Sequence, residues 1–248
     1  MTDDSVRREF HNKISRLSKS AAYLDYCEEL TGYKLCQFNM MDRQQLEYLF
    51  EPIPLSAEDR LLDLGCGSGG LLRALTEGKG CCGVGIDRLP PSAVGELGGR
   101  TQYICGDIDD IGRYKLKPTV TLAIDSLYFS RDPETLLRYL CGVEGNRLYI
   151  FFSQYLFDGS PADMDMLRPE RTRIALGLSS AGVRYTTLDY GENERLLYER
   201  SICALRARRE NFKREGNQDL YEQKLEEQLL GKRLYDSGRA GRWLYIVD

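Results

Sequence analysis

The 248-residue chain has one histidine, His11, and one tryptophan, and its eight cysteines show no C-x-x-C spacing. Several of the cysteines lie within apolar runs, where a free thiol behaves as a small hydrophobic side chain. Cys81 and Cys82 are adjacent, but they have no histidine partners with the spacing of a zinc site. We therefore expect reduced thiols and no bound metal.

The sequence also lacks a long apolar run and a strong charge of one sign. No segment approaches the roughly 18 apolar residues of a membrane span, and the first ten residues have no signal-peptide core. A formal net charge of -4 argues against a surface built to neutralise phosphates. The locally basic residues 7–19 fit the solvated face of a helix. We expect a cytoplasmic protein that spans no membrane and does not bind nucleic acid.

From Arg60 onward, short β-rich runs alternate with helical patterns, which indicates an α/β fold with a parallel sheet covered by helices. Four helices are predicted between these runs. One opens at Gly69, one follows Pro91, one begins after Asp132 as N-cap, and one ends at Gly182. Seven runs are predicted strands: 60–65, 81–87, 101–106, 119–125, 147–153, 183–190 and 243–248.

Two helical segments flank these strands. Residues 1–57 have a helical pattern, and residues 192–236 interpose helices before the last strand. Gly216 predicts a break between two inserted helices. The apolar faces of these helices carry Tyr198, Ile202, Leu205 and Phe212 in the first, and Tyr221, Leu225 and Leu229 in the second. We predict an N-terminal helical segment at 1–57 and a domain at 58–248 with an insertion at 192–236.

The sequence LLDLGCGSGG, residues 61–70, places glycines between a predicted strand and a predicted helix. Glycine lets a ligand approach the backbone closely, and ligands of open α/β sheets bind beyond the carboxyl ends of the strands. The spacing Gly65-x-Gly67-x-x-Gly70, with Asp87 twenty residues past Gly67, fits a dinucleotide fingerprint. Because Gly65-x-Gly67-x-Gly69 fits another pattern equally, the glycines alone do not identify the ligand.

Four carboxylates fall at the ends of four consecutive predicted strands: Asp63, Asp87, Asp107 and Asp125. A pyrophosphate prefers amide donors and positive charge, so these acids suit a cationic ligand better. S-adenosylmethionine carries a sulfonium, an ammonium, two ribose hydroxyls and an adenine amine, and a carboxylate can attract or accept a hydrogen bond from each. The acids therefore favour S-adenosylmethionine over a nicotinamide dinucleotide.

Three further motifs follow the glycine loop: GVGIDR at 83–88, CGDID at 105–109 and LAIDSLYF at 122–129. With them, the sequence resembles the class I, Rossmann-like S-adenosylmethionine-dependent methyltransferases of small-molecule type, over about residues 58–190. The resemblance implies a seven-stranded, doubly wound sheet of order 3-2-1-4-5-7-6 with the last strand antiparallel. It also implies S-adenosylmethionine as methyl donor, S-adenosylhomocysteine as product, and no metal.

The resemblance further implies roles for individual residues. Gly65, Gly67 and Gly69 would line the methionyl and ribose portion, Asp87 would accept from the ribose hydroxyls, and Asp125 would hold the ammonium. Taken alone, Asp107 and Asp125 also fit helix caps or turn residues. The complete cofactor-binding prediction comprises Asp63, Gly65, Cys66, Gly67, Gly69, Asp87, Arg88, Asp107, Ile108, Asp125 and Leu127.

The acceptor is predicted to be a small molecule with a nitrogen, sulfur or oxygen nucleophile, and no catalytic base is assigned. Candidate substrate-binding residues follow strands four and five or lie in the helical segments: Tyr23, Tyr128, Gln154 and Tyr198. Family members of this type close the site with a lid, which the two helical segments would form here. Phe38, Met40 and Met41 are then candidate wall residues.

Other functions remain open from the sequence. A catalytically silent S-adenosylmethionine-binding module would keep the same loop and acids. Arg88 next to Asp87 also fits the ribose phosphate site of an NADP-dependent oxidoreductase. An aminopropyl transferase would use a related donor, but it leaves Asp63 and Asp125 less well explained. In the resembled family, methylation of adenine N6 or glutamine amides goes with an N/D-P-P-Y/F motif after strand four. The corresponding sequence here, DSLY at 125–128, has no prolines, so the resemblance disfavours that branch.

Overall fold

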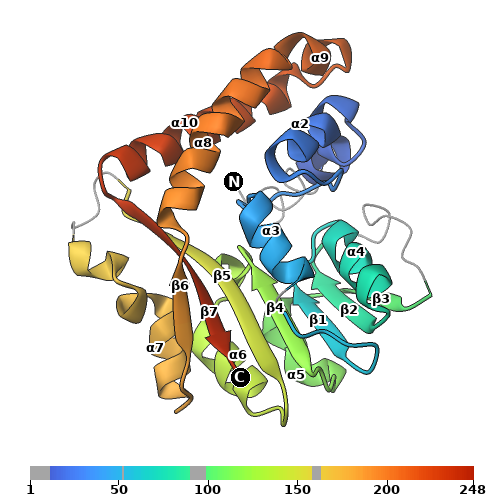
Figure 1. Ribbon diagram of the computed structural model, residues 1–248, viewed down its shortest axis with the longest axis vertical. Coiled ribbons are helices and arrows are strands. Elements are labelled where there is room, and N and C mark those ends of the chain that lie inside the picture. The colour runs from blue at the N-terminus through green and yellow to red at the C-terminus, as the bar shows by residue number, and fades with distance from the viewer. Residues whose placement is uncertain (1–11, 52, 90–98, 158–162) are drawn as a thin grey trace.

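The computed structural model describes residues 12–51, 53–89, 99–157 and 163–248, and contains a seven-stranded sheet of order β3-β2-β1-β4-β5-β7-β6 (Figure 1). β7 runs antiparallel to β5 and β6, and every other neighbouring pair is parallel. The predicted fold class and strand order are therefore confirmed. The strands are β1 Arg60–Leu64, β2 Cys82–Asp87, β3 Thr101–Cys105, β4 Val120–Ile124, β5 Arg147–Tyr155, β6 Thr186–Asp189 and β7 Ala240–Val247.

The seven predicted strands are all present, and the largest differences in their ends concern β6 and β7. β6 begins at Thr186 instead of 183, whereas β7 begins at Ala240, three residues before the predicted start. Ala240 and Gly241 pair with Tyr155 and Gln154 of the long β5. This pairing with β5 extends β7 into residues whose own sequence has little strand character.

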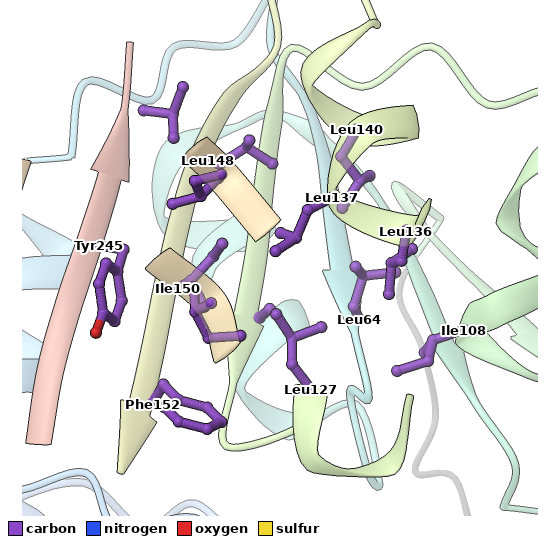
Figure 2. Packing of buried hydrophobic residues seen from close by; sticks show 14 of the residues in the cluster. Leu64, Ile108, Leu127, Leu136, Leu137, Leu140, Leu148, Ile150, Phe152 and Tyr245 are labelled. Atoms are coloured by element: carbon purple, nitrogen blue, oxygen red, sulfur yellow. The ribbon is translucent and has the colours of Figure 1, made fainter. Parts of the chain in front are cut away.

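Helices cover both faces of the sheet. On one face α3 (Arg43–Phe50) and α4 (Gly70–Lys79) pack over β1, β4 and β5. On the other, α6 (Pro133–Cys141) and α7 (Arg173–Ser180) pack over the same strands and β7. Figure 2 shows leucines of α6 in this second core, beside Ile108 and Leu127. Asp132 caps α6 as predicted, accepting a hydrogen bond from Thr135 N at 3.0 Å.

The remaining helices are short or lie outside the sheet layers. A 3₁₀ turn precedes α7, which begins after Thr172 and ends at Ser180, two residues before the predicted Gly182. His11 and the predicted helix after Pro91 lie outside the described residues. The other elements are α2 Ala21–Thr31, α5 Ile111–Tyr114, and the 3₁₀ turns η2 Ile108–Asp110, η3 Leu127–Phe129, η4 Met164–Leu167 and η5 Pro169–Arg171.

The insertion before β7 consists of α8 (Gly191–Ala207), α9 (Arg209–Arg214) and α10 (Gln218–Asp236). Figure 1 shows these helices extending beyond the sheet toward α2. The predicted break occurs at Gly216, but the first predicted helix is itself interrupted at Arg208. Tyr221 is buried as predicted, but Leu229 is 37 % exposed, because the buried side of α10 continues through Lys224, Gln228 and Gly231. The interior of the insertion is therefore partly polar.

Candidate functional site

The glycine loop follows β1 and turns into α4 through three left-handed backbone conformations, with φ of +72° at Gly65, +56° at Gly67 and +76° at Gly69. Side chains other than glycine rarely adopt this region. At Gly65 space is limiting as well, because an added Cβ would lie 2.4 Å from Ser126 Cβ. The Ser126 hydroxyl is buried and forms no hydrogen bond with the described residues. The loop and the turn after β4 therefore meet beside an unpaired polar atom.

Asp63 lies at the end of β1 and is 4 % exposed. Among the described residues, none donates a hydrogen bond or forms an ion pair with its carboxylate. Burial, together with the negative charge of Asp87, raises the pKa of this carboxyl from 3.8 to about 7. Such a group is strongly stabilised by a nearby positive charge, because a cation would replace the lost hydration.

Asp87 at the end of β2 organises the loop. Its Oδ2 accepts a hydrogen bond from Gly67 N at 2.8 Å, and its Oδ1 accepts one from Leu89 N at 2.9 Å. Each carboxylate oxygen can accept a second hydrogen bond. Cys66 packs against β2, since a Cβ added at Gly85 would lie 2.5 Å from its Sγ. Burial raises the pKa of the Cys66 thiol far above its usual range, so it stays protonated.

Asp107 has its partners within the chain. Arg88 donates to Oδ2 at 2.5 Å, Arg131 lies 3.4 Å from the same oxygen, and Asp109 N donates to Oδ1 at 3.0 Å. Asp107 thus caps η2, and Arg88 is turned toward the end of β3. Ile108 is buried in the core of Figure 2.

Asp125 directly follows β4 and adopts φ +50°, a conformation that a residue with a side chain keeps only where its surroundings hold it. Its Oδ2 accepts a hydrogen bond from Met40 N at 2.9 Å. Arg242 donates to both carboxylate oxygens, at 2.8 Å and 3.0 Å. The charge of Asp125 is therefore paired within the chain, and the role predicted for it at the cofactor ammonium stays a prediction.

Arg242 on β7 is fully buried and links separate elements. Besides Asp125, it donates through Nε to Gln45 Oε1 of α3 at 2.6 Å and through Nη1 to Ser153 Oγ of β5 at 2.8 Å. Burial alone would lower the pKa of Arg242, but the charges of Asp125 and Glu194 outweigh it and raise this pKa. The guanidinium is therefore permanently charged and joins the end of β4 to the helical segments.

Glu194 of α8 is also fully buried, with Oε2 3.9 Å from Arg242 Nη1. Its carboxylate accepts hydrogen bonds from Ser153 at 2.7 Å, Tyr155 at 2.6 Å and Tyr235 at 2.5 Å. Here burial raises the pKa of the Glu194 carboxyl, and Arg242 opposes this shift. The network holds α8 and α10 to the ends of β5 and β7.

The four candidate substrate residues lie in different surroundings. Tyr128 belongs to the Arg242 network, because its hydroxyl donates to Asp125 at 3.3 Å and accepts from Ser153 N at 2.7 Å. Tyr198 joins the same network at Tyr155, with 3.0 Å between the hydroxyls. Tyr23 is buried against α8, and the Gln154 side chain donates a hydrogen bond to the carbonyl of Tyr155 at 3.4 Å.

Five predicted cofactor residues lie together at the glycine loop: Asp63, Gly65, Cys66, Gly67 and Asp87. The loop continues through Gly69 into α4. Arg88 and Asp107 lie beside Ile108. Leu127 is buried in the core, two residues past Asp125.

Sequence reasoning missed Ser126, Glu194 and Arg242. A charged residue inside the apolar strand GRWLYIVD was a usable signal for Arg242. Glu194 gave none, because acids are ordinary in the first turn of a helix.

No helix in the described part of the chain is long and apolar enough to cross a membrane. No group of three or more histidine, cysteine, aspartate or glutamate side chains in that part could hold a metal ion.

Comparison with known proteins finds similarity in structure only. No family model matches the chain, and no curated protein matches its sequence. Phospholethanolamine N-methyltransferase 2 of Haemonchus contortus, solved with phosphomonomethylethanolamine and S-adenosylhomocysteine, superposes with a TM-score of 0.69 at 14 % identity. That match covers 96 % of this chain and 59 % of the longer protein, so the chain spans well under two thirds of its length.

Two other solved structures match over nearly equal lengths. The cyclopropane synthase MmaA2 of Mycobacterium tuberculosis has a TM-score of 0.69 at 11 % identity, covering 96 % of this chain and 97 % of that one. A putative sarcosine dimethylglycine methyltransferase of Galdieria sulphuraria has a TM-score of 0.65 at 16 % identity, covering 83 % and 84 %. Together with the strand order, these matches show that the chain has the fold of the class I, Rossmann-like S-adenosylmethionine-dependent methyltransferases.

Proposed function

We propose that the protein transfers a methyl group from S-adenosylmethionine to a small-molecule acceptor. The observation that carries this proposal is Asp63, a buried carboxylate that pairs with no described residue, beside three left-handed glycines. The residues fit the cofactor, because Asp63 would attract its cationic methionyl end and Gly65 and Gly67 leave room for it along the backbone. Asp87 keeps acceptor capacity for the ribose hydroxyls.

The unpaired Ser126 hydroxyl supports the same placement, since it faces the loop at Gly65 and requires a partner. Arg88 and Asp107 would border the adenine, with the main chain at Ile108. S-adenosylmethionine would supply an electrophilic methyl group on a sulfonium that is already a good leaving group. The chain has then to align the acceptor in line with the methyl group and to exclude water. The helical segments 1–57 and 192–236 would act as the lid.

The tyrosines of the network supply no free base. Burial raises the pKa of Tyr128, Tyr155 and Tyr198 well above 10, so their hydroxyls stay protonated. A neutral amine or a thiolate needs no base, whereas a hydroxyl must lose its proton. We therefore favour a nitrogen or sulfur nucleophile over oxygen. Two of the structural neighbours are described as methyltransferases of amine compounds, which agrees with this preference.

The first test is calorimetry of the full chain with S-adenosylmethionine and S-adenosylhomocysteine. We expect both to bind, and Asp87→Ala to weaken binding at least tenfold, on the order of 1.4 kcal/mol. Absence of any binding heat from the folded protein would refute the proposal.

A second measurement separates an enzyme from a silent binding module. The protein is incubated with S-adenosylmethionine and panels of small amines, thiols and phenols, and S-adenosylhomocysteine is quantified. Transfer to an amine or thiol is expected, and the Asp63→Asn variant serves as control. Tight cofactor binding without transfer to any panel member would favour the silent module.

A further inference from the structure

A small cavity lies between α2, the segment that follows it, and α10. Its volume is about 20 Å³, and its lining includes Tyr23, Gln37, Asn39, Met40 and Lys224. A space of this size accepts one small group and not a whole acceptor molecule. Any acceptor that uses it would place a terminal group there and keep its nucleophile outside.

Gln37 is the first sign that the cavity takes a ligand. The residue is 7 % exposed, and neither Nε2 nor Oε1 of its side chain forms a hydrogen bond with the described residues. Its backbone carbonyl accepts a hydrogen bond from the Tyr23 hydroxyl at 2.5 Å, so the residue is held in place while its amide is free. A buried amide that is left unpaired is destabilising, and a bound polar group would restore its lost hydrogen bonds.

Lys224 gives the cavity its charge. It is 9 % exposed on the buried side of α10, and its Nζ lies 3.2 Å from Glu227 Oε2. Glu227 also pairs with Lys13, so two ammonium groups share one carboxylate. An ammonium has three donors, and the pair with Glu227 uses one of those of Lys224. The surplus positive charge favours an anionic oxygen ligand.

The segment that lines the cavity also borders the proposed cofactor site. Gln37 and Asn39 line the cavity, whereas Phe38 lies 3.7 Å from the position of a Cβ at Gly67. Met40 lines the cavity and donates its backbone N–H to Asp125. The cavity and the glycine loop therefore lie against the same short segment, residues 37–40.

We propose that this cavity binds an anionic oxygen group, a carboxylate or a phosphate, of the methyl acceptor. Lys224 pairs with its charge, and Gln37 Nε2 donates a hydrogen bond to it. Gln37 Oε1 accepts a hydrogen bond from a donor next to the anionic group. The inference rests on the proposed function and narrows its substrates to small acceptors that carry an acidic group.

The test uses inorganic phosphate and acetate as probes in thermal unfolding of the full chain, against sodium chloride of equal ionic strength. We expect at least one probe to raise the unfolding midpoint saturably, and the more effective probe identifies the acidic group. Lys224→Met and Gln37→Leu should each weaken that response at least tenfold. Lys213→Met, at an exposed lysine of α9, is the matched control and should respond like the wild type.

Gln37→Leu adds a readout that does not depend on Lys224, since replacing an unpaired amide with an apolar group should raise the midpoint without any anion. A wild-type response no larger than that to chloride, or one that persists in Lys224→Met and Gln37→Leu, would overturn the inference. Calorimetry with S-adenosylhomocysteine on the same samples separates the two proposals. Cofactor binding without an anion response contradicts only the cavity, whereas loss of cofactor binding contradicts the proposed function.

Discussion

At the scale of single residues, the charge of Asp63 lowers the stability of the folded protein and is expected to strengthen the binding of a cationic ligand. Its carboxyl is buried without a partner, and its pKa of about 7 means that the folded protein holds this proton more tightly than the unfolded chain does. The associated stability is complete below about pH 4 and is lost as the pH rises through 7. The shift corresponds to a few kcal/mol, because one pKa unit is about 1.4 kcal/mol.

The Asp63→Asn variant should therefore unfold at a higher temperature than the wild type at pH 8, with the difference vanishing near pH 4. Thermal unfolding across this pH range measures it. Asp25→Asn, on the outer side of α2, is the control and should show no such trend. Equal unfolding midpoints of Asp63→Asn and the wild type at pH 8 would show that the charge of Asp63 does not destabilise the folded protein.

Cofactor binding should depend on pH through the same group. A cation binds the ionised carboxylate, so affinity for S-adenosylmethionine should fall by up to tenfold per pH unit below pH 7 and level off above it. Calorimetry between pH 5 and 9 measures the profile. In Asp63→Asn the affinity should be low and the step near pH 7 absent, and a step retained in that variant would assign it to another group.

Arg242 joins two carboxylates that belong to different parts of the fold, the fully buried Glu194 and Asp125, whose side chain is 12 % exposed. Removing the guanidinium leaves both charges unpaired, so Arg242→Met should lower the free energy of unfolding by about 3–5 kcal/mol. Arg242→Lys keeps the positive charge but loses the bidentate hydrogen bonding of the guanidinium. Its free energy of unfolding should therefore lie between those of Arg242→Met and the wild type. Urea denaturation measures both variants. An Arg242→Met variant as stable as the wild type would mean that the network contributes no net stability.

At the scale of elements, α8 and α10 meet where Gly231 makes room for Tyr198. A Cβ added at Gly231 would lie 2.1 Å from Tyr198 Cζ. Gly231→Ala should displace that ring from Tyr155 and Glu194 and destabilise the protein by about 1–3 kcal/mol. Gly78→Ala in α4 is the matched control, since nothing lies within 4 Å of its added Cβ.

These two substitutions are expected to have opposite signs. An open helical glycine gains about 0.5–1 kcal/mol on becoming alanine, because alanine has the higher helix propensity. Urea denaturation compares the pair with the wild type. Stabilisation of both variants would contradict this expectation and would mean that the Tyr198 ring moves aside for the added methyl group at little energetic cost.

The buried side of α10 also shows what an apolar pattern leaves out. The spacing of Tyr221, Leu225 and Leu229 predicts one buried face. Tyr221 is buried, but Leu229 is exposed, and the polar Lys224 and Gln228 are buried instead. A pattern count ranks side chains by hydrophobicity, whereas burial here follows the close approach of α10 to Tyr198 at Gly231. The burial of polar residues inside the helical insertion therefore could not be predicted from the sequence pattern and is seen only in the tertiary structure.

At the scale of the whole molecule, ligand binding and folding are linked. If the folded chain alone binds S-adenosylhomocysteine, the ligand at one hundred times its Kd adds about 2.7 kcal/mol to the free energy of unfolding. Thermal unfolding with increasing S-adenosylhomocysteine should raise the midpoint in the wild type and leave Asp63→Asn nearly unmoved. An equal shift in both proteins would place the ligand away from Asp63.

The sequence by itself determined the sheet and the glycine loop. The strands are short β-rich runs separated by turn residues, and three glycines must adopt left-handed φ, so local chemistry leaves few alternatives. The ends of β6 and β7 were less well predicted, because pairing across the sheet with β5 extends β7 beyond its own propensity.

Only the tertiary structure decided how the charges are paired. The carboxylates at the strand ends look alike in sequence, but Asp63 is left unpaired while Asp107 meets Arg88 and Asp125 meets Arg242, 117 residues away. The energy of a charge depends on burial and on the partners that folding brings near it, and neither is encoded in local spacing.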